Sequence, residues 1–261
     1  MTDETPLLYE TDGAVAIITM NRPDALNAIS AKMREEFAAT FAKVEADDEI
    51  RTVVLTANGR AFSAGTNLME DFLADREDVT DHIMRDYKPL IDAIGTSDKT
   101  YIAALNGLCG GVAIGFALNC DLAVMADDAF IFMPFANISL VPDGGSSWLF
   151  LDRLGYKRAY AAILEGERLD AQTCKEAGMV NKIVPAAEVK QTAIDWAHKL
   201  SQIAPLTLLH SKRLLREVVD MNFEQTVKRE AEIQHICMSS EDFEEGVAAF
   251  SEKRKPVFKG K

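Results

Sequence analysis

Units of strand, turn and helix repeat over the first 185 residues or so, and only helical patterns follow them. Apolar, β-rich runs at 14–20, 52–57 and 101–105 each end in turn residues such as Asn58-Gly59 and Asn106-Gly107, which is typical of buried strands. A serine cap at position 30 and apolar residues at helical spacing predict a helix with an inward face of Met33, Phe37, Phe41 and Val44. This alternation predicts an α/β core.

The remaining elements extend the pattern and then change it. Further strands are expected at 122–125, 129–132 and 180–184, and helices after Thr80, after Gly110-Gly111 and after position 143. From Pro205 onward the periodicity is helical alone, at 206–218, 223–237 and 241–250. We therefore divide the chain into a core at 1–200 and a helical region at 201–261.

The charge and the ends of the chain exclude several classes of protein. A net charge of −13 disfavours nucleic acid and anionic membranes, which both require a basic surface. The apolar runs are too short to span a membrane, and the acidic start of the sequence is unlike a signal peptide. We expect a cytosolic protein with no nucleic acid or membrane partner.

The common nucleotide-binding, metal-binding and histidine–nucleophile motifs are missing from the sequence. It contains no G-x-G-x-x-G and no P-loop, so a Rossmann or nucleotide-triphosphatase site is not expected. Neither the cysteines nor the histidines have metal-ligand spacing, and no histidine lies beside a nucleophile. We expect no metal site, and we interpret the cysteines as small buried residues: Cys109, Cys120, Cys174 and Cys237.

One carboxylate has unusual surroundings, in the turn Pro142-Asp143-Gly144-Gly145 between two aromatic, apolar stretches. Removal from water raises the pKa of a carboxyl group, and such a group can act as a general base near neutral pH. The same residues could instead form a turn whose aspartate caps the following helix.

Two strands end in glycine turns, at Ser63-Ala64-Gly65 and at Cys109-Gly110-Gly111-Val112. Glycine lets backbone N–H groups point outward and lets a ligand approach closely. Two such groups directed at one point would form an oxyanion hole, and the helix that begins at the second turn would strengthen it. Spacing alone also permits two ordinary loops.

Taken together, the motifs resemble the crotonase, or enoyl-CoA hydratase/isomerase, family over nearly the whole chain. In order, they are N-R-P-D-A-L-N-A-I at 21–29, G-R-A-F-S-A-G-T-N-L at 59–68, N-G-L-C-G-G at 106–111, C-D-L at 120–122, P-F-A-N-I-S-L-V-P-D-G-G at 134–145 and F-S-E-K-R-K-P-V-F at 250–258. The resemblance implies a spiral of repeated β-β-α units, followed by helices that build a homotrimer or a dimer of trimers.

The resemblance also implies an acyl-CoA substrate and no separate cofactor. The thioester oxygen would lie between the backbone N–H groups of Ala64 and Val112, with Gly111 as the alternative second donor. Phe250 and Lys253 match positions that reach the CoA of a neighbouring subunit, although a solvated basic helix end would look the same. The expected lining of the CoA cleft is Ser63, Ala64, Gly65, Thr66, Asn67 and Leu68.

The chemistry expected of this member follows from three positions. Hydratases of the family use two glutamates, and the matching positions here hold Gly115 and Phe135, of which Phe135 would make the pocket drier. Asp143 matches the single acid of the family's isomerases, so we predict an acyl-CoA double-bond isomerase, of the 3-enoyl-CoA or the epoxyphenylacetyl-CoA type.

Three alternatives remain open: a hydratase with an unusual site, a dehalogenase or hydrolase with Asp143 as nucleophile, and a catalytically silent binding protein on the same fold. The predicted acyl pocket, which ordinary helix packing would explain equally well, consists of Met69, Phe72, Leu73, Ile83, Met84 and Tyr87.

Overall fold

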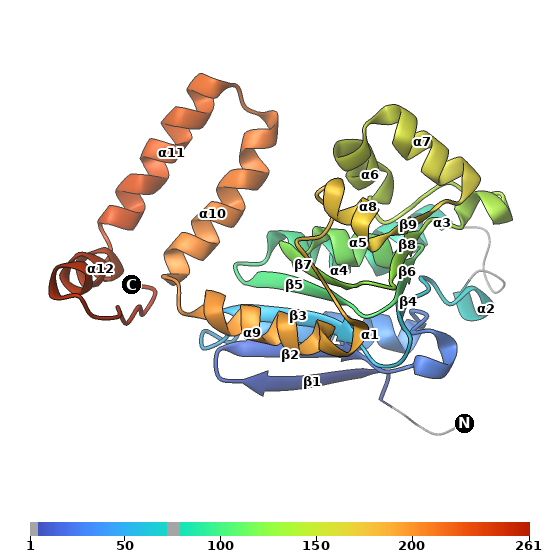
Figure 1. The fold of residues 1–261 in the computed structure, drawn as a ribbon, viewed down its shortest axis with the longest axis horizontal. Coiled ribbons are helices and arrows are strands. Elements are labelled where there is room, and N and C mark those ends of the chain that lie inside the picture. The colour runs from blue at the N-terminus through green and yellow to red at the C-terminus, as the bar shows by residue number, and fades with distance from the viewer. Residues whose placement is uncertain (1–4, 72–78) are drawn as a thin grey trace.

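Two sheets organise the core of the computed structural model, which describes residues 5–71 and 79–261 (Figure 1). The larger sheet has six strands in the order β1-β2-β3-β5-β7-β10, and the smaller has four in the order β4-β6-β8-β9. The strands are β1 Leu7–Asp12, β2 Val15–Met20, β3 Thr52–Ala57, β4 Ala61–Ser63, β5 Thr100–Leu105, β6 Leu108–Gly110, β7 Leu122–Ala126, β8 Phe130–Phe132, β9 Arg168–Asp170 and β10 Lys182–Val184.

Most helices pack around the two sheets, and the last three extend away from them (Figure 1). The α-helices are α1 Ala31–Glu45, α2 Leu68–Asp71, α3 Val79–His82, α4 Lys88–Thr96, α5 Ala113–Asn119, α6 Ser146–Leu154, α7 Tyr156–Glu165, α8 Ala171–Glu176, α9 Val189–Ser201, α10 Pro205–Glu217, α11 Phe223–Met238 and α12 Glu241–Glu252. A π-helical turn at Ile83–Tyr87 joins α3 to α4, and short 3-10 turns lie at Pro23–Ala25, Phe135–Ile138, Ala186–Glu188 and Val218–Asp220.

The same β-β-α unit recurs along the core. β3, β5 and β7 pair in parallel within the larger sheet, while β4, β6 and β8, which follow them in the chain, pair in parallel within the smaller one. Helices follow each of these strand pairs. The predicted spiral of β-β-α units is therefore confirmed, and it places the ends of β4 and β6 side by side.

Local sequence explains these elements. Every residue of β2, β3 and β5 is buried, as their continuous apolar runs predict. The Ser30 side chain accepts a hydrogen bond from the Met33 amide at 3.2 Å and so caps α1, whose Met33, Phe37, Phe41 and Val44 are buried as expected.

Three elements were not anticipated from the sequence. β1 pairs antiparallel with β2 at the edge of the larger sheet, although its sequence is largely polar or exposed. The short β9 adds an antiparallel edge strand to β8. The helix α9 covers one face of the larger sheet, where it contacts β2, β3, β5 and β7 (Figure 1). Its buried residues, Val189, Ala193, Ala197 and Ser201, are small, which gives only a weak periodic signal.

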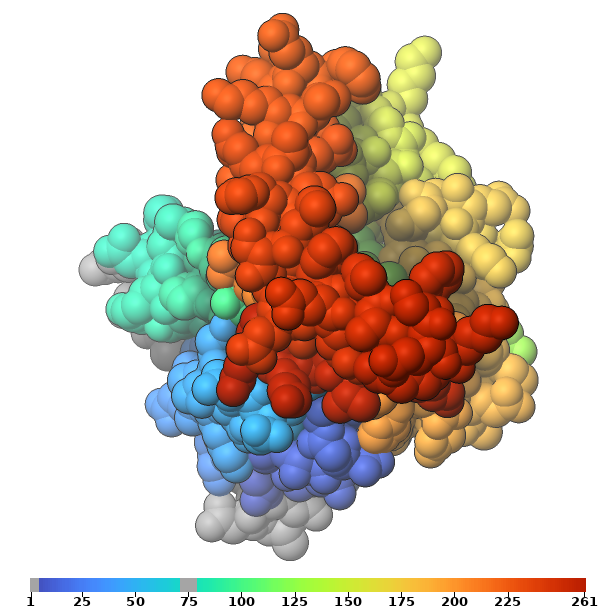
Figure 2. Space-filling model, turned by 90° about the vertical axis from the view of Figure 1, so that its left-hand side faces the viewer, coloured from blue at the N-terminus to red at the C-terminus, as the bar shows by residue number. Residues whose placement is uncertain are grey.

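The predicted helical tail is confirmed as α10, α11 and α12, which project from the core as an arm (Figure 1). In the view that faces the left-hand side of Figure 1, the arm lies in front of the core (Figure 2). Lys212 of α10 is 8% exposed, and its Nζ donates to the carbonyl oxygens of Ile94 and Lys99 and pairs with Asp121 at 3.0 Å. This buried ammonium fastens the start of the arm to the core.

Within residues 5–71 and 79–261, we find no helix that is long and apolar enough to cross a membrane.

Candidate active site

The two glycine turns predicted from the sequence lie against each other. Gly65 and Gly111 both have positive φ, at 96° and 57°, which glycine adopts without strain. A Cβ atom on Gly65 would lie 2.9 Å from the Gly110 carbonyl oxygen and 3.3 Å from the Val112 nitrogen. Only a residue without a side chain permits this approach, so the turn after β4 reaches the start of α5.

The backbone hydrogen bonds decide which amides remain available in these turns. The Ala64 amide donates to the Leu26 carbonyl at 2.9 Å, so the prediction that it is a free oxyanion donor is wrong. The Gly111 amide donates to Phe132 at 3.4 Å, which favours Val112 as the second donor. Within the described part of the chain, the amides of Thr66 and Val112 make no hydrogen bond.

Ser63 holds the first turn together and is not part of a cleft. Its hydroxyl donates to the Asn27 carbonyl at 2.8 Å and accepts from the Gly65 amide at 3.1 Å. Because Ser63 is 0% exposed, the prediction that it lines the CoA cleft is wrong. Thr66 and Asn67 are half-buried and Leu68 is exposed, so they remain accessible to a ligand.

Asp143 does not cap the helix that follows it. The α6 helix begins after Gly145 without any side-chain cap, and it is the Asp143 carbonyl oxygen that accepts from the Ser146 amide (3.0 Å) and hydroxyl (2.6 Å). The capping interpretation is therefore wrong. The carboxyl group is left for another role.

The Asp143 carboxyl group is partly withdrawn from water. Its Oδ1 is buried and has no hydrogen-bond partner among the described residues. Desolvation by burial raises the pKa of Asp143 to about 6. A hydrogen bond from its own backbone lowers this pKa only in part. A buried carboxylate oxygen without a partner costs free energy, so a group with a strongly perturbed pKa of this kind marks a candidate functional site.

The turn that carries Asp143 packs onto Val112, whose backbone amide makes no hydrogen bond to the part of the chain that the structure describes. Gly144 has φ of 60°, and a Cβ atom there would lie 3.0 Å from Val112 Cγ2 and 3.2 Å from Ile91 Cδ1. The acid, the start of α5 and the two glycine turns therefore converge on Val112. Phe135 is 6% exposed and belongs to the core cluster.

A mostly apolar cavity of about 380 Å³ adjoins this turn. Two residues of the predicted acyl pocket, Ile83 and Met84, line it. Tyr87 is buried against Arg34 instead, Met69 is 79% exposed, and Phe72 and Leu73 lie outside the described residues. The remaining lining residues are Lys88, Ile91, Asp92, Asn119, Gly144, Gly145, Trp148 and Leu149.

Phe250 and Lys253 do not join this site within one subunit. They lie at the end of α12, in the arm, whereas Asp143 directly precedes α6, which belongs to the core and lies apart from α12 (Figure 1). Phe250 is 87% exposed.

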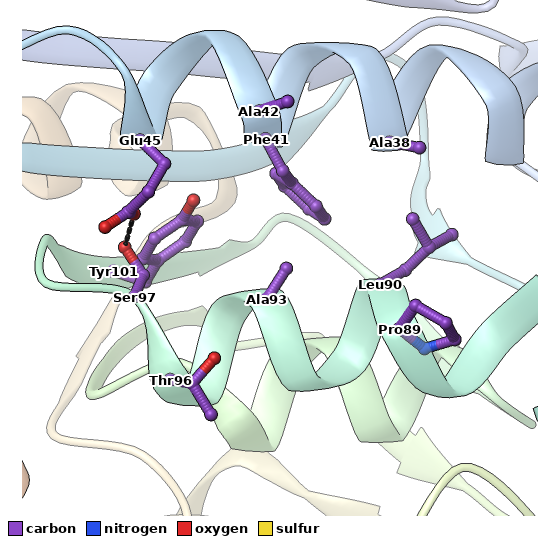
Figure 3. Close-up of a pocket in the computed structure, with 10 residues that line it drawn as sticks. All are labelled: Ala38, Phe41, Ala42, Glu45, Pro89, Leu90, Ala93, Thr96, Ser97 and Tyr101. Carbon is purple, nitrogen blue, oxygen red and sulfur yellow. Dashed lines mark hydrogen bonds between the residues drawn. The ribbon is translucent and has the colours of Figure 1, made fainter.

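A second hollow of about 400 Å³ lies between α1 and α4, away from Asp143 (Figure 3). Its Glu45 carboxylate accepts a hydrogen bond from the Ser97 hydroxyl at 2.6 Å, and burial raises the pKa of Tyr101. The acid is thus already partnered and the phenol is kept neutral, so we assign no chemistry to this hollow.

Residues 5–71 and 79–261 contain no cluster of three or more histidine, cysteine, aspartate or glutamate side chains that could hold a metal ion.

Sequence reasoning missed Thr66 as a donor, because the carbonyl that accepts the hydrogen bond of the Ala64 amide belongs to Leu26, which is distant in the sequence. It also missed Ile91 and Trp148, whose apolar side chains have no distinctive local signal.

Comparisons with known proteins identify the family of this chain. The family model for enoyl-CoA hydratase/isomerase matches residues 10–261, and the chain therefore belongs to that family. It is 31% identical to 1,2-epoxyphenylacetyl-CoA isomerase of Escherichia coli (strain K12), with 98% of each chain covered. It is also 31% identical to a probable enoyl-CoA hydratase of Rhodobacter capsulatus, with 97% of each covered.

Solved structures give the same fold. An enoyl-CoA hydratase from Bacillus anthracis superposes with a TM-score of 0.93 at 26% identity, over 98% of this chain and 100% of that one. Hydratase and isomerase names thus both occur among the relatives, so the choice between the two reactions depends on the site of this chain.

Proposed function

We propose that this protein is an acyl-CoA double-bond isomerase with Asp143 as its catalytic acid/base. The Asp143 carboxylate takes a proton from carbon 2 of a 3-enoyl-CoA. The electron pair delocalises onto the thioester oxygen, and the resulting dienolate is stabilised by the Thr66 and Val112 amides. Return of the proton to carbon 4 gives the 2-enoyl-CoA, so no other reactant is consumed.

The buried, unpartnered Oδ1 of Asp143 carries this proposal. A base with a pKa of about 6 is ionised at neutral pH. It is still basic enough to accept a proton from carbon 2 of the substrate, because the oxyanion hole would stabilise the resulting enolate and so make that C–H bond more acidic. The apolar side chains of the neighbouring cavity limit competition from water.

Hydration by the family's two-glutamate route is disfavoured in this chain. Gly115 has no side chain, and Phe135 is a buried apolar residue. Neither can orient or activate a water molecule. Covalent catalysis through Asp143 also gains little support. The dehalogenases that this route resembles carry a histidine in the helix before the third strand, and His82, the nearest candidate here, lies too early in that segment and pairs through Nδ1 with Asp86 at 2.7 Å.

A second candidate reaction of the same site is isomerisation of the ring epoxide of phenylacetyl-CoA. It is favoured by the 31% identity to the Escherichia coli enzyme of that name. The cavity beside Gly144 is bordered by the aromatic Trp148 and by Ile91, which suit an aromatic acyl group as well as an aliphatic one.

The test compares 3-hexenoyl-CoA with the epoxide of phenylacetyl-CoA, each incubated with the protein and with Asp143→Asn, and followed by absorbance and chromatography of the thioesters. We expect turnover of at least one substrate and its loss in the variant. Full activity of Asp143→Asn, or hydration as the main reaction, would refute the proposal. No turnover together with no exchange of the carbon-2 protons in deuterated water would favour a silent binding protein.

We further propose that residues 201–261 form the subunit contacts of a trimer or a dimer of trimers. Several large apolar side chains of the arm are more than 45% exposed, which is unusual for a surface that stays in water: Leu215, Val219, Phe223, Val227, Ile236, Val247 and Phe250. Pairing these surfaces between subunits would bury them and would bring Phe250 and Lys253 towards a neighbour.

A further inference from the structure

Gly115 lies in the first turns of α5, directly beneath the turn that carries Asp143. A Cβ atom on Gly115 would lie well inside 3.0 Å of the Gly144 carbonyl oxygen, and 3.2 Å from Gly144 C and from Ile91 Cδ1. Real Cβ atoms do not make such short contacts, and the atom in the way belongs to the backbone. No rotation of a side chain can relieve it.

Gly144 faces this position in a matching way. A Cβ atom on Gly144 would meet Val112 Cγ2 at 3.0 Å and the Val112 carbonyl oxygen at 3.4 Å. The Gly115 amide in turn donates to that Val112 carbonyl at 3.0 Å. The two glycines therefore let the 142–145 turn rest on the first turn of α5 with no side chain of either residue between them.

We propose that Gly115 is a positioning residue, whose missing side chain sets the distance between the Asp143 turn and the oxyanion amide of Val112. The inference rests on the proposed isomerase function and deepens it. It has a structural consequence: any side chain at position 115, including the glutamate of the two-acid hydratases, is incompatible with the present place of Asp143. The single-acid arrangement and the two-acid arrangement thus exclude each other in this backbone.

The decisive variant is Gly115→Ala, which adds one methyl group. The Gly144 carbonyl must then move by roughly 1 Å, and misplacement of a catalytic group by that amount lowers kcat about 100-fold. We expect KM to change by less than about threefold, because the Thr66 and Val112 amides stay in place. We also expect the midpoint of the pH profile of kcat/KM to fall towards 4, because displacement of the 142–145 turn away from α5 would expose the Asp143 carboxyl group to water.

Gly246→Ala is the matched control. Gly246 also lies in a helix, α12, and its added Cβ would meet only ring carbons of Phe258, at 3.6 and 3.9 Å. These are ordinary van der Waals distances, so this variant should keep the activity and pH profile of the wild type. If Gly115→Ala alone does not fold, we combine it with Ile91→Val, which removes the Cδ1 atom that lies 3.2 Å from the added methyl group.

A kcat within threefold of the wild type and an unchanged pH midpoint in folded Gly115→Ala would overturn the inference, and Gly115 would then be a packing residue only. A crystal structure of the variant gives a readout that does not depend on activity. An unmoved Gly144 carbonyl overturns the inference even if the isomerase function holds, and a displaced turn supports it even if the substrate proves to be a different acyl-CoA.

Discussion

Replacing Asp143 by asparagine should abolish turnover and stabilise the fold at the same time. Burial raises the pKa of Asp143 to about 6 from an ordinary value of 3.8. Above both values the carboxylate is ionised in the folded and the unfolded protein, and the folded state bears the full cost of its desolvation. A difference of about two pH units corresponds to about 3 kcal/mol, at ~1.4 kcal/mol per unit.

The size of the stability gain of Asp143→Asn depends on pH. Below about pH 4 the carboxyl group is protonated in both states, and its burial has no electrostatic cost. As the pH rises from 4 to 6, the unfolded chain loses the proton first, so the native protein loses stability relative to it. A neutral asparagine has no such dependence. The variant should therefore gain up to about 3 kcal/mol at pH 8, reduced by the cost of burying an unpaired amide, and nothing at pH 4.

The assay is urea unfolding at pH 4, 6 and 8, at one protein concentration because subunit association also contributes to stability. Asp152→Asn is the control, since the Asp152 side chain lies on α6 and is 45% exposed. If Asp143→Asn is no more stable than the wild type at pH 8, or if its gain is the same at all three values, the carboxylate is not desolvated as described.

Five further outcomes follow from the same structure. The kcat/KM of the wild type should rise with pH to a plateau, with a midpoint near 6, because Asp143 must be ionised to act as a base; a profile flat from pH 5 to 8 would contradict this. Val112→Pro removes one amide while the φ of −58° at this position suits proline, so kcat should fall about 100- to 1000-fold in steady-state assays, whereas Val112→Ala, which keeps the amide, should lose far less. Lys212→Ala leaves the Asp121 carboxylate without its buried partner and should lower the free energy of unfolding by about 3 kcal/mol in urea, and an unaltered unfolding midpoint would argue against the role of Lys212 in fastening the arm. Phe250→Ala should raise KM for acyl-CoA several-fold at unchanged kcat if the arm reaches a neighbouring site, and sedimentation of Leu215→Asp should show dissociation if the arm forms the subunit contacts.

Local patterns in the sequence predicted the fold well, because its central strands are buried on every residue and its helices have regular apolar faces. Thr52–Ala57 matches β3 to the residue. The failures lie where tertiary packing overrides local pattern. The mostly exposed β1 is a strand because β2 offers it an edge, and α9 packs closely on the sheet because the residues that it buries are small.

The site was predicted in part. Glycine and the isolated acid have strong local signals, so the sequence indicated both turns and Asp143. The sequence could not show which amide was free, because that depends on the Leu26 carbonyl, which approaches Ala64 only after the chain has folded. Gly115 was recognised for the carboxylate that it lacks, whereas its contact with Gly144 depends on two segments about thirty residues apart.

The contact between Gly65 and the Gly110–Gly111 turn also bears on the entropy of ligand binding. No side chain of these glycines lies between the two turns, so the spacing of the Thr66 and Val112 amides is set by the backbones of β4 and β6, which pair within one sheet. A site built from side chains must order each of them when the ligand arrives, at about 0.5–1.5 kcal/mol for each one immobilised. In the proposed oxyanion hole the two donors have no rotamers to lose, so more of their interaction with a thioester oxygen would remain available to stabilise its negative charge.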